Sequence, residues 1–276
     1  MTVKSSAIPY QLPKIDRLSI VSAMIILAYL LTHFINLPAR ILSIQLPGLF
    51  LSIGINISTI VSVLVAGLTA AGADWLLFDH PDLQGRPILP HCLLPSLTAL
   101  LIGIPLYQLS FGLAWWLALL GGSLLLILVL IAEYVSVGRD DFRRYVASAG
   151  LTAVSLASYL ILAAGLRSVG TRLFFLLPAL MLGSALVSLR ILHLRLQGQW
   201  LTYEALLIAF MTSQIAAALY YWPLNPISFG LLLLGTTYLL ITIFSRMIEE
   251  KPMRQLWVEL LLIIVVVIGA AVWTNS

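Results

Sequence analysis

The stretch GLAWWLALLGGSLLLILVLIA, residues 112–132, contains no charged side chain. About 20 apolar residues in an α-helix cover the roughly 30 Å hydrocarbon core of a bilayer, so this stretch predicts a membrane-spanning helix. The whole chain agrees with that interpretation. Of its 276 residues, 61 % are hydrophobic and 9 % charged, whereas a soluble domain carries roughly 25 % charged residues. With a mean hydropathy of +1.05, the chain is predicted to have lipid as its solvent.

Similar apolar windows recur along the chain and predict an all-α, polytopic transmembrane bundle of nine helices. The predicted spans are residues 18–37, 48–73, 92–109, 112–132, 145–166, 172–193, 201–222, 227–245 and 255–274. Residues 1–17, which include two prolines and three basic side chains, are predicted to form a cytoplasmic polar tail. Residues 18–276 then form a single transmembrane domain.

The distribution of basic residues predicts the orientation. If the N-terminus is cytoplasmic, twelve of the 15 basic residues lie on the cytoplasmic side, and only Arg40, Arg167 and Arg172 lie outside. Cytoplasmic loops of membrane proteins carry such an excess of lysine and arginine. We therefore expect a multi-pass protein of the cytoplasmic membrane, with the N-terminus inside and the C-terminus outside.

Two short segments suggest an internal repeat. PLYQLSFGL at 105–113 and PLNPISFGL at 223–231 share an initial Pro-Leu and a final Ser-Phe-Gly-Leu, at an offset of 118 residues. Both are predicted to connect an outgoing and a returning span on the outer side. The match fits duplication of a four-helix unit. It also fits convergence, because tight turns select proline and glycine in any protein.

The segment DWLLFDHPDLQGRPILPH, from Asp74 to His91, contains the densest group of polar residues. If the protein is an enzyme, Asp74, Asp79 and Asp82 are the candidate catalytic carboxylates. Asp79, His80, Asp82 and His91 are weaker candidates for metal ligands, because carboxylate and imidazole together suit zinc or manganese. The prolines and the glycine of the segment indicate a turn. We favour a connector between the second and third spans, with no catalytic residue and no metal.

The same segment resembles the first aspartate-rich motif of intramembrane prenyltransferases of the UbiA type. That family has nine spans, a cytoplasmic N-terminus and this motif between helices two and three. The resemblance implies Mg²⁺-dependent transfer of a prenyl group, with the three aspartates as metal ligands. The aspartate spacing departs from the family pattern, and the loop at 190–204, where the second motif would lie, contains no aspartate. The resemblance therefore implies a degenerate or inactive relative.

Polar and small residues within the spans provide further candidates. Asn56 and Gln214 are the strongest polar residues at depth, which makes them the candidate ligand-binding residues. In the fifth span, Ala149, Ala153 and Ala157 follow one another at intervals of four. Small residues let helices approach closely, and the same stripe is able to line a ligand groove. We favour close packing in the bundle interior and leave the groove open.

These observations lead to a functional expectation. We expect a non-enzymatic membrane protein, either a scaffold or partner subunit or a handler of a neutral or lipidic ligand. A prenyltransferase relative and a facilitative transporter are the alternatives. No cofactor is expected, except Mg²⁺ under the prenyltransferase alternative. The expected partners are the lipid bilayer, other membrane proteins or further copies of the chain. Nucleic acid is excluded because the basic residues are scattered over short loops.

Overall fold

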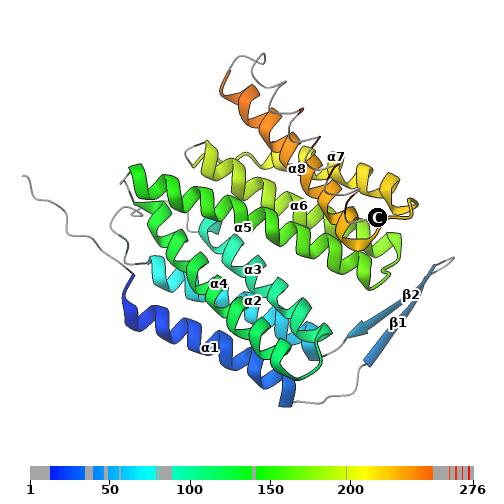
Figure 1. The fold of residues 1–276 in the computed structure, drawn as a ribbon, viewed down its shortest axis with the longest axis horizontal. Coiled ribbons are helices and arrows are strands. Elements are labelled where there is room, and N and C mark those ends of the chain that lie inside the picture. The colour runs from blue at the N-terminus through cyan, green and yellow to red at the C-terminus, as the bar shows by residue number, and fades with distance from the viewer. Residues whose placement is uncertain are drawn as a thin grey trace, which may run out of the picture.

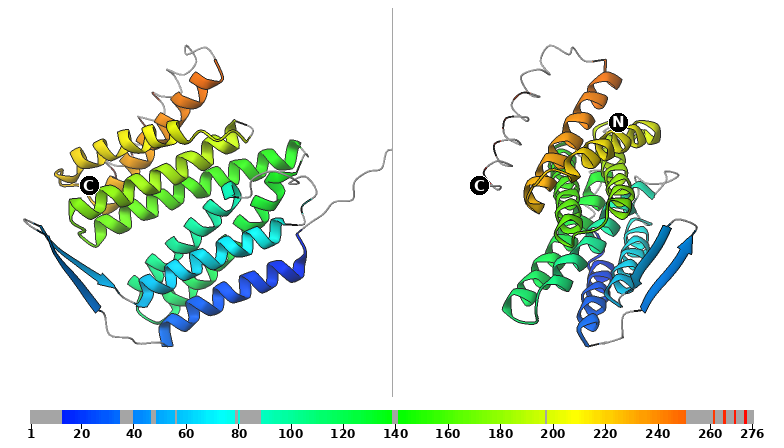
Figure 2. Two further views of the ribbon diagram at one scale, coloured as in Figure 1. Left: turned by 180° about the vertical axis from the view of Figure 1, so that it is seen from behind. Right: turned by 90° about the vertical axis from the view of Figure 1, so that its right-hand side faces the viewer.

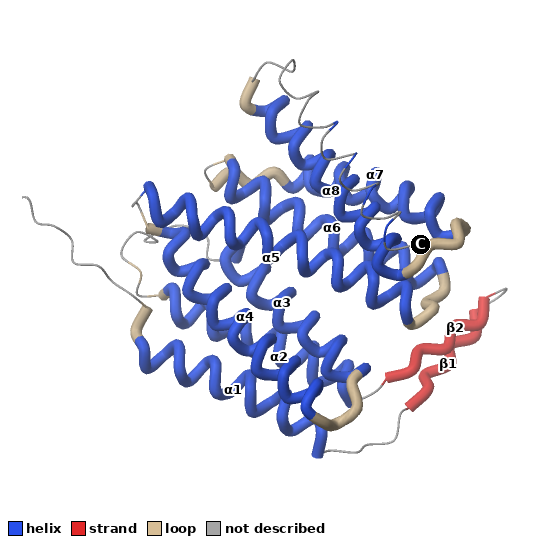
Figure 3. The backbone as a smooth tube through the Cα atoms, in the orientation of Figure 1, coloured by secondary structure: helices blue, strands red, loops and turns tan. Residues whose placement is uncertain are grey.

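The computed structural model places the helices in one bundle, with a β-hairpin at its side (Figures 1 and 3). The structure describes residues 13–34, 40–46, 49–55, 57–78, 80, 89–138, 141–196 and 198–250, together with positions 261, 265, 269 and 273. Within this part of the chain there are eight helices and two strands.

The described helices alternate in direction along the chain. They are α1 (Ile15–Phe34), α2 (Ile57–Leu77), α3 (Leu89–Gln108), α4 (Leu113–Val137), α5 (Asp141–Ser168), α6 (Leu173–Arg195), α7 (Thr202–Tyr220) and α8 (Pro226–Ile248). Seven of them, α2 to α8, are long and apolar enough to cross a membrane. This confirms the prediction of a helical, multi-pass membrane protein. We call the end of the bundle at which α1, α3, α5 and α7 begin the inner end.

The predicted count of nine spans is not reproduced in full. α1 begins within the predicted polar tail, and it is not among the seven helices that meet the length and hydropathy criteria. The ninth predicted span, 255–274, lies outside the described residues except for four isolated positions. For the third to eighth spans, the helices α3 to α8 lie where the apolar windows predicted them.

The second predicted span, 48–73, needs a correction. Its first residues belong to a hairpin, in which β1 (Arg40–Leu46) pairs antiparallel with β2 (Leu49–Ile55), and α2 begins only at Ile57. The strands read RILSIQL and LFLSIGI, where isoleucine and leucine alternate with other residues at the period of a strand. Apolar content alone does not separate such a run from a helix, which explains the error.

The described helices lie in two groups, α1 to α4 and α5 to α8 (Figures 1 and 2), and each group has its own apolar core. The buried residues of the first core come from α1, α2, α3 and α4, and those of the second come from α5 to α8 and from Leu196, directly after α6. A small third cluster, Leu94, Val129 and Leu151, lies where α3, α4 and α5 meet. The described helices therefore form two four-helix units, and α5 packs against the first of them.

Helix packing in the second unit depends on a close approach at Gly230. A Cβ atom built on this glycine of α8 would lie 2.8 Å from Leu160 Cδ1 and 3.2 Å from the Leu160 carbonyl oxygen on α5. The 2.8 Å distance is shorter than real Cβ atoms make, and the 3.2 Å distance to a backbone oxygen is tighter than most. The absence of a side chain at Gly230 thus sets the distance between α5 and α8.

The predicted repeat segments occupy related but unequal positions. Both connect consecutive helices, α3 to α4 and α7 to α8. In the first, Phe111 precedes α4 and is 52 % exposed, whereas Phe229 in the second lies inside α8 and is fully buried. Pro226 opens α8 early because its fixed φ suits the first helical position. The likeness in sequence is therefore not matched by an equivalent local structure.

Candidate functional site

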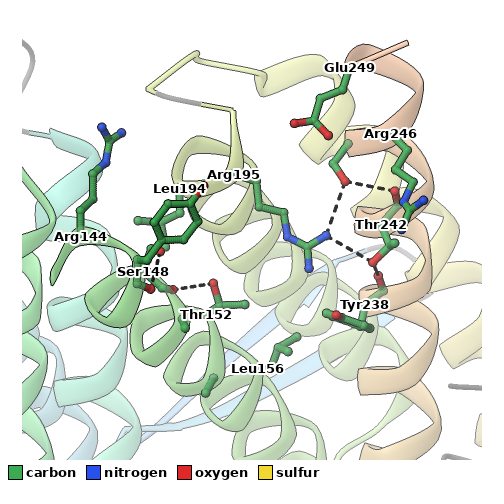
Figure 4. Close-up of a pocket in the computed structure, with 14 residues that line it drawn as sticks. Arg144, Ser148, Thr152, Leu156, Leu194, Arg195, Tyr238, Thr242, Arg246 and Glu249 are labelled. Carbon is green, nitrogen blue, oxygen red and sulfur yellow. Dashed lines mark hydrogen bonds between the residues drawn. The ribbon is translucent and has the colours of Figure 1, made fainter. Parts of the chain in front are cut away.

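A cavity of about 770 Å³ lies between α5, α6 and α8 at the inner end of the bundle (Figure 4). Its charged lining residues are Arg144 on α5, Arg195 at the last residue of α6, and Arg246 and Glu249 at the end of α8. The rest of the wall consists of small, hydroxyl-bearing and apolar side chains. A volume of this size is within the range of small-molecule sites.

Arg195 has a fixed position on the wall of this cavity. Its Nη1 donates to Thr242 Oγ1 at 3.3 Å and to Ser245 Oγ at 3.4 Å, and its guanidinium carbon lies 5.3 Å from the centre of the Tyr238 ring (Figure 4). Its Nε and Nη2 have no hydrogen-bond partner among the described residues. These two nitrogens form the edge of a guanidinium that binds carboxylate or phosphate oxygens in pairs.

The charged residues that line the cavity give it a net positive charge. Three arginines and one glutamate give the lining a formal charge of +2. Arg144 is exposed and has no acidic partner in the part of the chain that is described. The hydroxyls of Ser148 and Thr152 donate to carbonyls of their own helix, at 2.9 and 2.8 Å. The guanidinium groups of Arg144 and Arg195 are thus the principal donors available to a ligand.

The alanine stripe of the fifth span forms part of this cavity. Ala149 and Ala153 are exposed, and both line the cavity together with Leu156. The structure therefore favours the groove over close packing for these positions. This cavity therefore has a charged end, formed by arginines, and an apolar wall, formed by Ala149, Ala153 and Leu156.

A second polar feature is a buried network that joins the two four-helix units. Glu133 near the end of α4 and Arg190 on α6 are each 1 % exposed. Arg190 donates to both oxygens of Glu133, through Nε to Oε1 at 3.1 Å and through Nη2 to Oε2. His91 Nδ1, on α3, lies 3.0 Å from the same Oε2. The pair is bidentate, which is the strongest geometry for such an interaction.

Two atoms beside this network have no partner among the described residues. Nη1 of Arg190 and Nδ1 of His193, one turn further along α6, are both buried and without a hydrogen bond. The His193 ring lies 5.9 Å from the ring of His91 and 6.1 Å from that of Trp200, between ring centres. Buried donors are normally satisfied, and an unsatisfied one costs stability.

The pairing of Glu133 with Arg190 was not predicted. Glu133 directly follows the predicted span 112–132 and Arg190 lies near the end of the predicted span 172–193, so the available signal was that both lie at the cytoplasmic ends of their spans. Opposite charges at one membrane level are able to pair when their helices are neighbours. The sequence does not show which helices are neighbours, so the pair could not be predicted.

Of the residues predicted as candidates for catalysis and ligand binding, the structure describes Asp74 and Gln214, which lie on different helices. Asp74 is exposed on α2. Gln214 is exposed on α7 and does not line the cavity at α5, α6 and α8. Asp79, Asp82 and Asn56 lie outside the described residues. Their proposed roles stay predictions.

The two histidines proposed as metal ligands have separate surroundings. His80 is buried, and its ring lies 4.6 Å from that of Tyr134 in an edge-on arrangement. His91 instead faces Glu133. Among the residues that the structure describes, no group of three or more histidine, cysteine, aspartate or glutamate side chains is placed to hold a metal ion.

Comparison with known proteins gives one match. The model of a family described as "Protein of unknown function (DUF5656)" matches residues 37–274, which is most of the chain. No curated protein and no solved structure matches the chain.

Proposed function

We propose that this chain, which belongs to the DUF5656 family, is a lipid-binding membrane protein whose cavity between α5, α6 and α8 takes an anionic headgroup. The observation that carries this proposal is Arg195. Two hydroxyls and a tyrosine ring hold its guanidinium in place, and its Nε–Nη2 edge has no partner in the described chain.

The energetics of the site support an anionic ligand. A guanidinium at the inner end of a membrane-spanning helix is costly unless it is paired or hydrated. Only Nη1 of Arg195 is hydrogen-bonded, and both of its acceptors are neutral hydroxyls. No acidic side chain among the described residues therefore neutralises the charge of Arg195. A phosphate or carboxylate group would form two charge-assisted hydrogen bonds with the remaining edge.

The apolar part of the cavity supports an amphipathic ligand rather than a free ion. Ala149, Ala153 and Leu156 continue the wall from the arginines toward the middle of α5. An acyl or prenyl chain packs against such a surface, while the headgroup stays at the charged end. This agrees with the expectation of a handler of a lipidic ligand, and it needs no metal or cofactor.

The proposed orientation places this headgroup site in the inner leaflet. With a cytoplasmic N-terminus, the ends of α6 and α8 that carry Arg195 and Arg246 face the cytoplasm. Anionic lipids attract basic residues at that surface. The positive-inside distribution and the cavity thus support the same arrangement of the protein in a cell membrane.

Binding of a short-chain anionic lipid tests the proposal. Purified protein in neutral detergent is titrated with dioctanoyl phosphatidylglycerol by calorimetry, as the wild type and as Arg195→Gln. Loss of a bidentate charged contact is worth about 1.5–3 kcal/mol, so Arg195→Gln should weaken binding by at least about tenfold.

The matched control is Arg143→Gln. Arg143 stands next to Arg144 on α5 but lines a separate apolar groove between α4 and α5. This substitution removes one arginine charge at the same end of the bundle, outside the cavity, and should leave the affinity unchanged. Equal loss in both variants, or loss in neither, would show that the cavity does not bind the headgroup.

A further inference from the structure

We infer that the headgroup bound by this cavity is a phosphate monoester, as in phosphatidic acid or another lipid with a terminal phosphate. This inference rests on the proposed function, since it identifies the ligand of the same cavity. It adds a prediction that the general proposal does not make, namely preference for a doubly charged headgroup over a singly charged one.

The first argument is charge balance. Arg144 and Arg195, which have no acidic partner among the described residues, together carry a charge of +2 in the lining of the cavity. Near neutral pH a phosphate monoester carries a charge of about −1.5 to −2, whereas a phosphodiester headgroup such as phosphatidylglycerol carries one negative charge. In a site next to the hydrocarbon core, an uncompensated charge is costly. The monoester comes closest to cancelling the charge of the lining.

The second argument is the number of free phosphate oxygens. The Nε–Nη2 edge of Arg195 binds two oxygens of one phosphate. A monoester has a third terminal oxygen, whereas the corresponding position of a diester is an ester oxygen that carries no full charge. Arg144 and Arg246 lie on opposite sides of Arg195 (Figure 4), on α5 and α8. The exposed side chain of Arg144 stands across the cavity from Arg195 (Figure 4), and we infer that it turns toward this third oxygen when the headgroup binds.

The third argument concerns zwitterionic lipids. Their ammonium groups need carboxylates or stacked aromatic rings. Glu249 is the only acidic residue among the described lining residues, and it lies exposed after the last turn of α8. Three arginines outnumber it in the same space. The cavity therefore disfavours a headgroup that brings its own positive charge.

The experiment compares dioctanoyl phosphatidic acid with dioctanoyl phosphatidylglycerol in calorimetric titrations of the full chain. At about pH 8 the wild type should bind phosphatidic acid at least about tenfold more tightly. At about pH 5 this advantage should shrink toward equality, because the monoester dianion takes up a proton near pH 6 and becomes a monoanion. Phosphatidylglycerol does not titrate in this range, so it reports any pH effect on the protein itself.

Two variants divide the outcomes. Arg144→Gln should lower the preference for phosphatidic acid while leaving phosphatidylglycerol binding nearly unchanged, and Arg195→Gln should weaken binding of both lipids. Arg143→Gln should alter neither. If the wild type binds both lipids equally while Arg195→Gln weakens both, the monoester inference is wrong and the proposed function stands.

If Arg195→Gln changes neither affinity, the proposed function fails and the inference fails with it. A titration with inorganic phosphate separates lipid from free anion. Phosphate alone should bind at least about tenfold more weakly than phosphatidic acid, because each buried methylene group of the acyl chains raises the affinity about fourfold. Equal affinities would overturn the assignment to a lipid.

Discussion

Removing the charge of Glu133 should destabilise the protein more than removing any exposed carboxylate. The substitution Glu133→Gln keeps the size of the side chain and its hydrogen-bonding capacity. It leaves Arg190, which is 1 % exposed, as a buried cation without a carboxylate. Nη1 of Arg190 already has no hydrogen-bond partner in the described chain. Losing a hydrogen bond to residue 133 would therefore leave a second nitrogen of this guanidinium without a partner.

The magnitude follows from the geometry of the pair. Breaking a buried ion pair by removing one partner costs about 3–5 kcal/mol. Glu133→Gln should lie at the lower end of this range, since the amide oxygen is still able to accept one hydrogen bond from Arg190. Arg190→Gln should cost a similar amount, because it strands the carboxylate. The double variant should lose about 1–3 kcal/mol less than the sum of the single losses.

Reversible unfolding in mixed detergent micelles, followed by the fluorescence of the seven tryptophans, measures these values. The control is Glu204→Gln. Glu204 lies in the first turn of α7, partly exposed and without a charged partner among the described residues, and its loss should stay within about 0.5 kcal/mol. A loss below about 1 kcal/mol for Glu133→Gln, or strict additivity in the double variant, would refute the reasoning.

Four further substitutions and one chemical modification test the packing. Gly230→Ala should cost about 1–3 kcal/mol through overpacking against α5, whereas Gly121→Ala, whose Cβ meets nothing within 4 Å, should stabilise α4 by about 0.5–1 kcal/mol; unfolding in mixed micelles measures both. Tyr159→Phe removes a hydroxyl without a partner in the described chain and should change stability by less than about 0.5 kcal/mol. Tyr29→Phe removes a donor to a carbonyl of α3 and should cost about 1 kcal/mol. Cys92, 9 % exposed, should react with a maleimide, followed by mass spectrometry, much more slowly in the folded protein than after denaturation.

The sequence predicted most of the helices because the bilayer imposes a minimum length on each apolar segment. From α3 onward, the predicted and observed boundaries differ by a few residues, as at 112–132 against Leu113–Val137. The hairpin before α2 was not predicted. Its strands are as apolar as a span, and its pairing is a contact between two segments that hydropathy does not record.

The candidate site was predictable only in part. The small residues Ala149 and Ala153 were recognised, and a groove was one of two alternatives for them. Arg195 was counted only as one of the charges that indicate orientation. Its significance depends on Thr242 and Ser245, which lie 47 and 50 residues further along the chain. Such distant partners follow from helix adjacency, and neither composition nor spacing encodes it.

The separation of the two cores has a consequence for biogenesis. The first core uses no residue beyond Val137, so the first four helices are able to pack together while the ribosome is still translating the rest. Glu133 meets its partner only when Arg190, 57 residues later, has entered the membrane. Until then its carboxyl group lacks the bidentate contact with Arg190 that it has in the complete fold. Formation of this ion pair therefore marks the moment at which the second half of the chain joins the first.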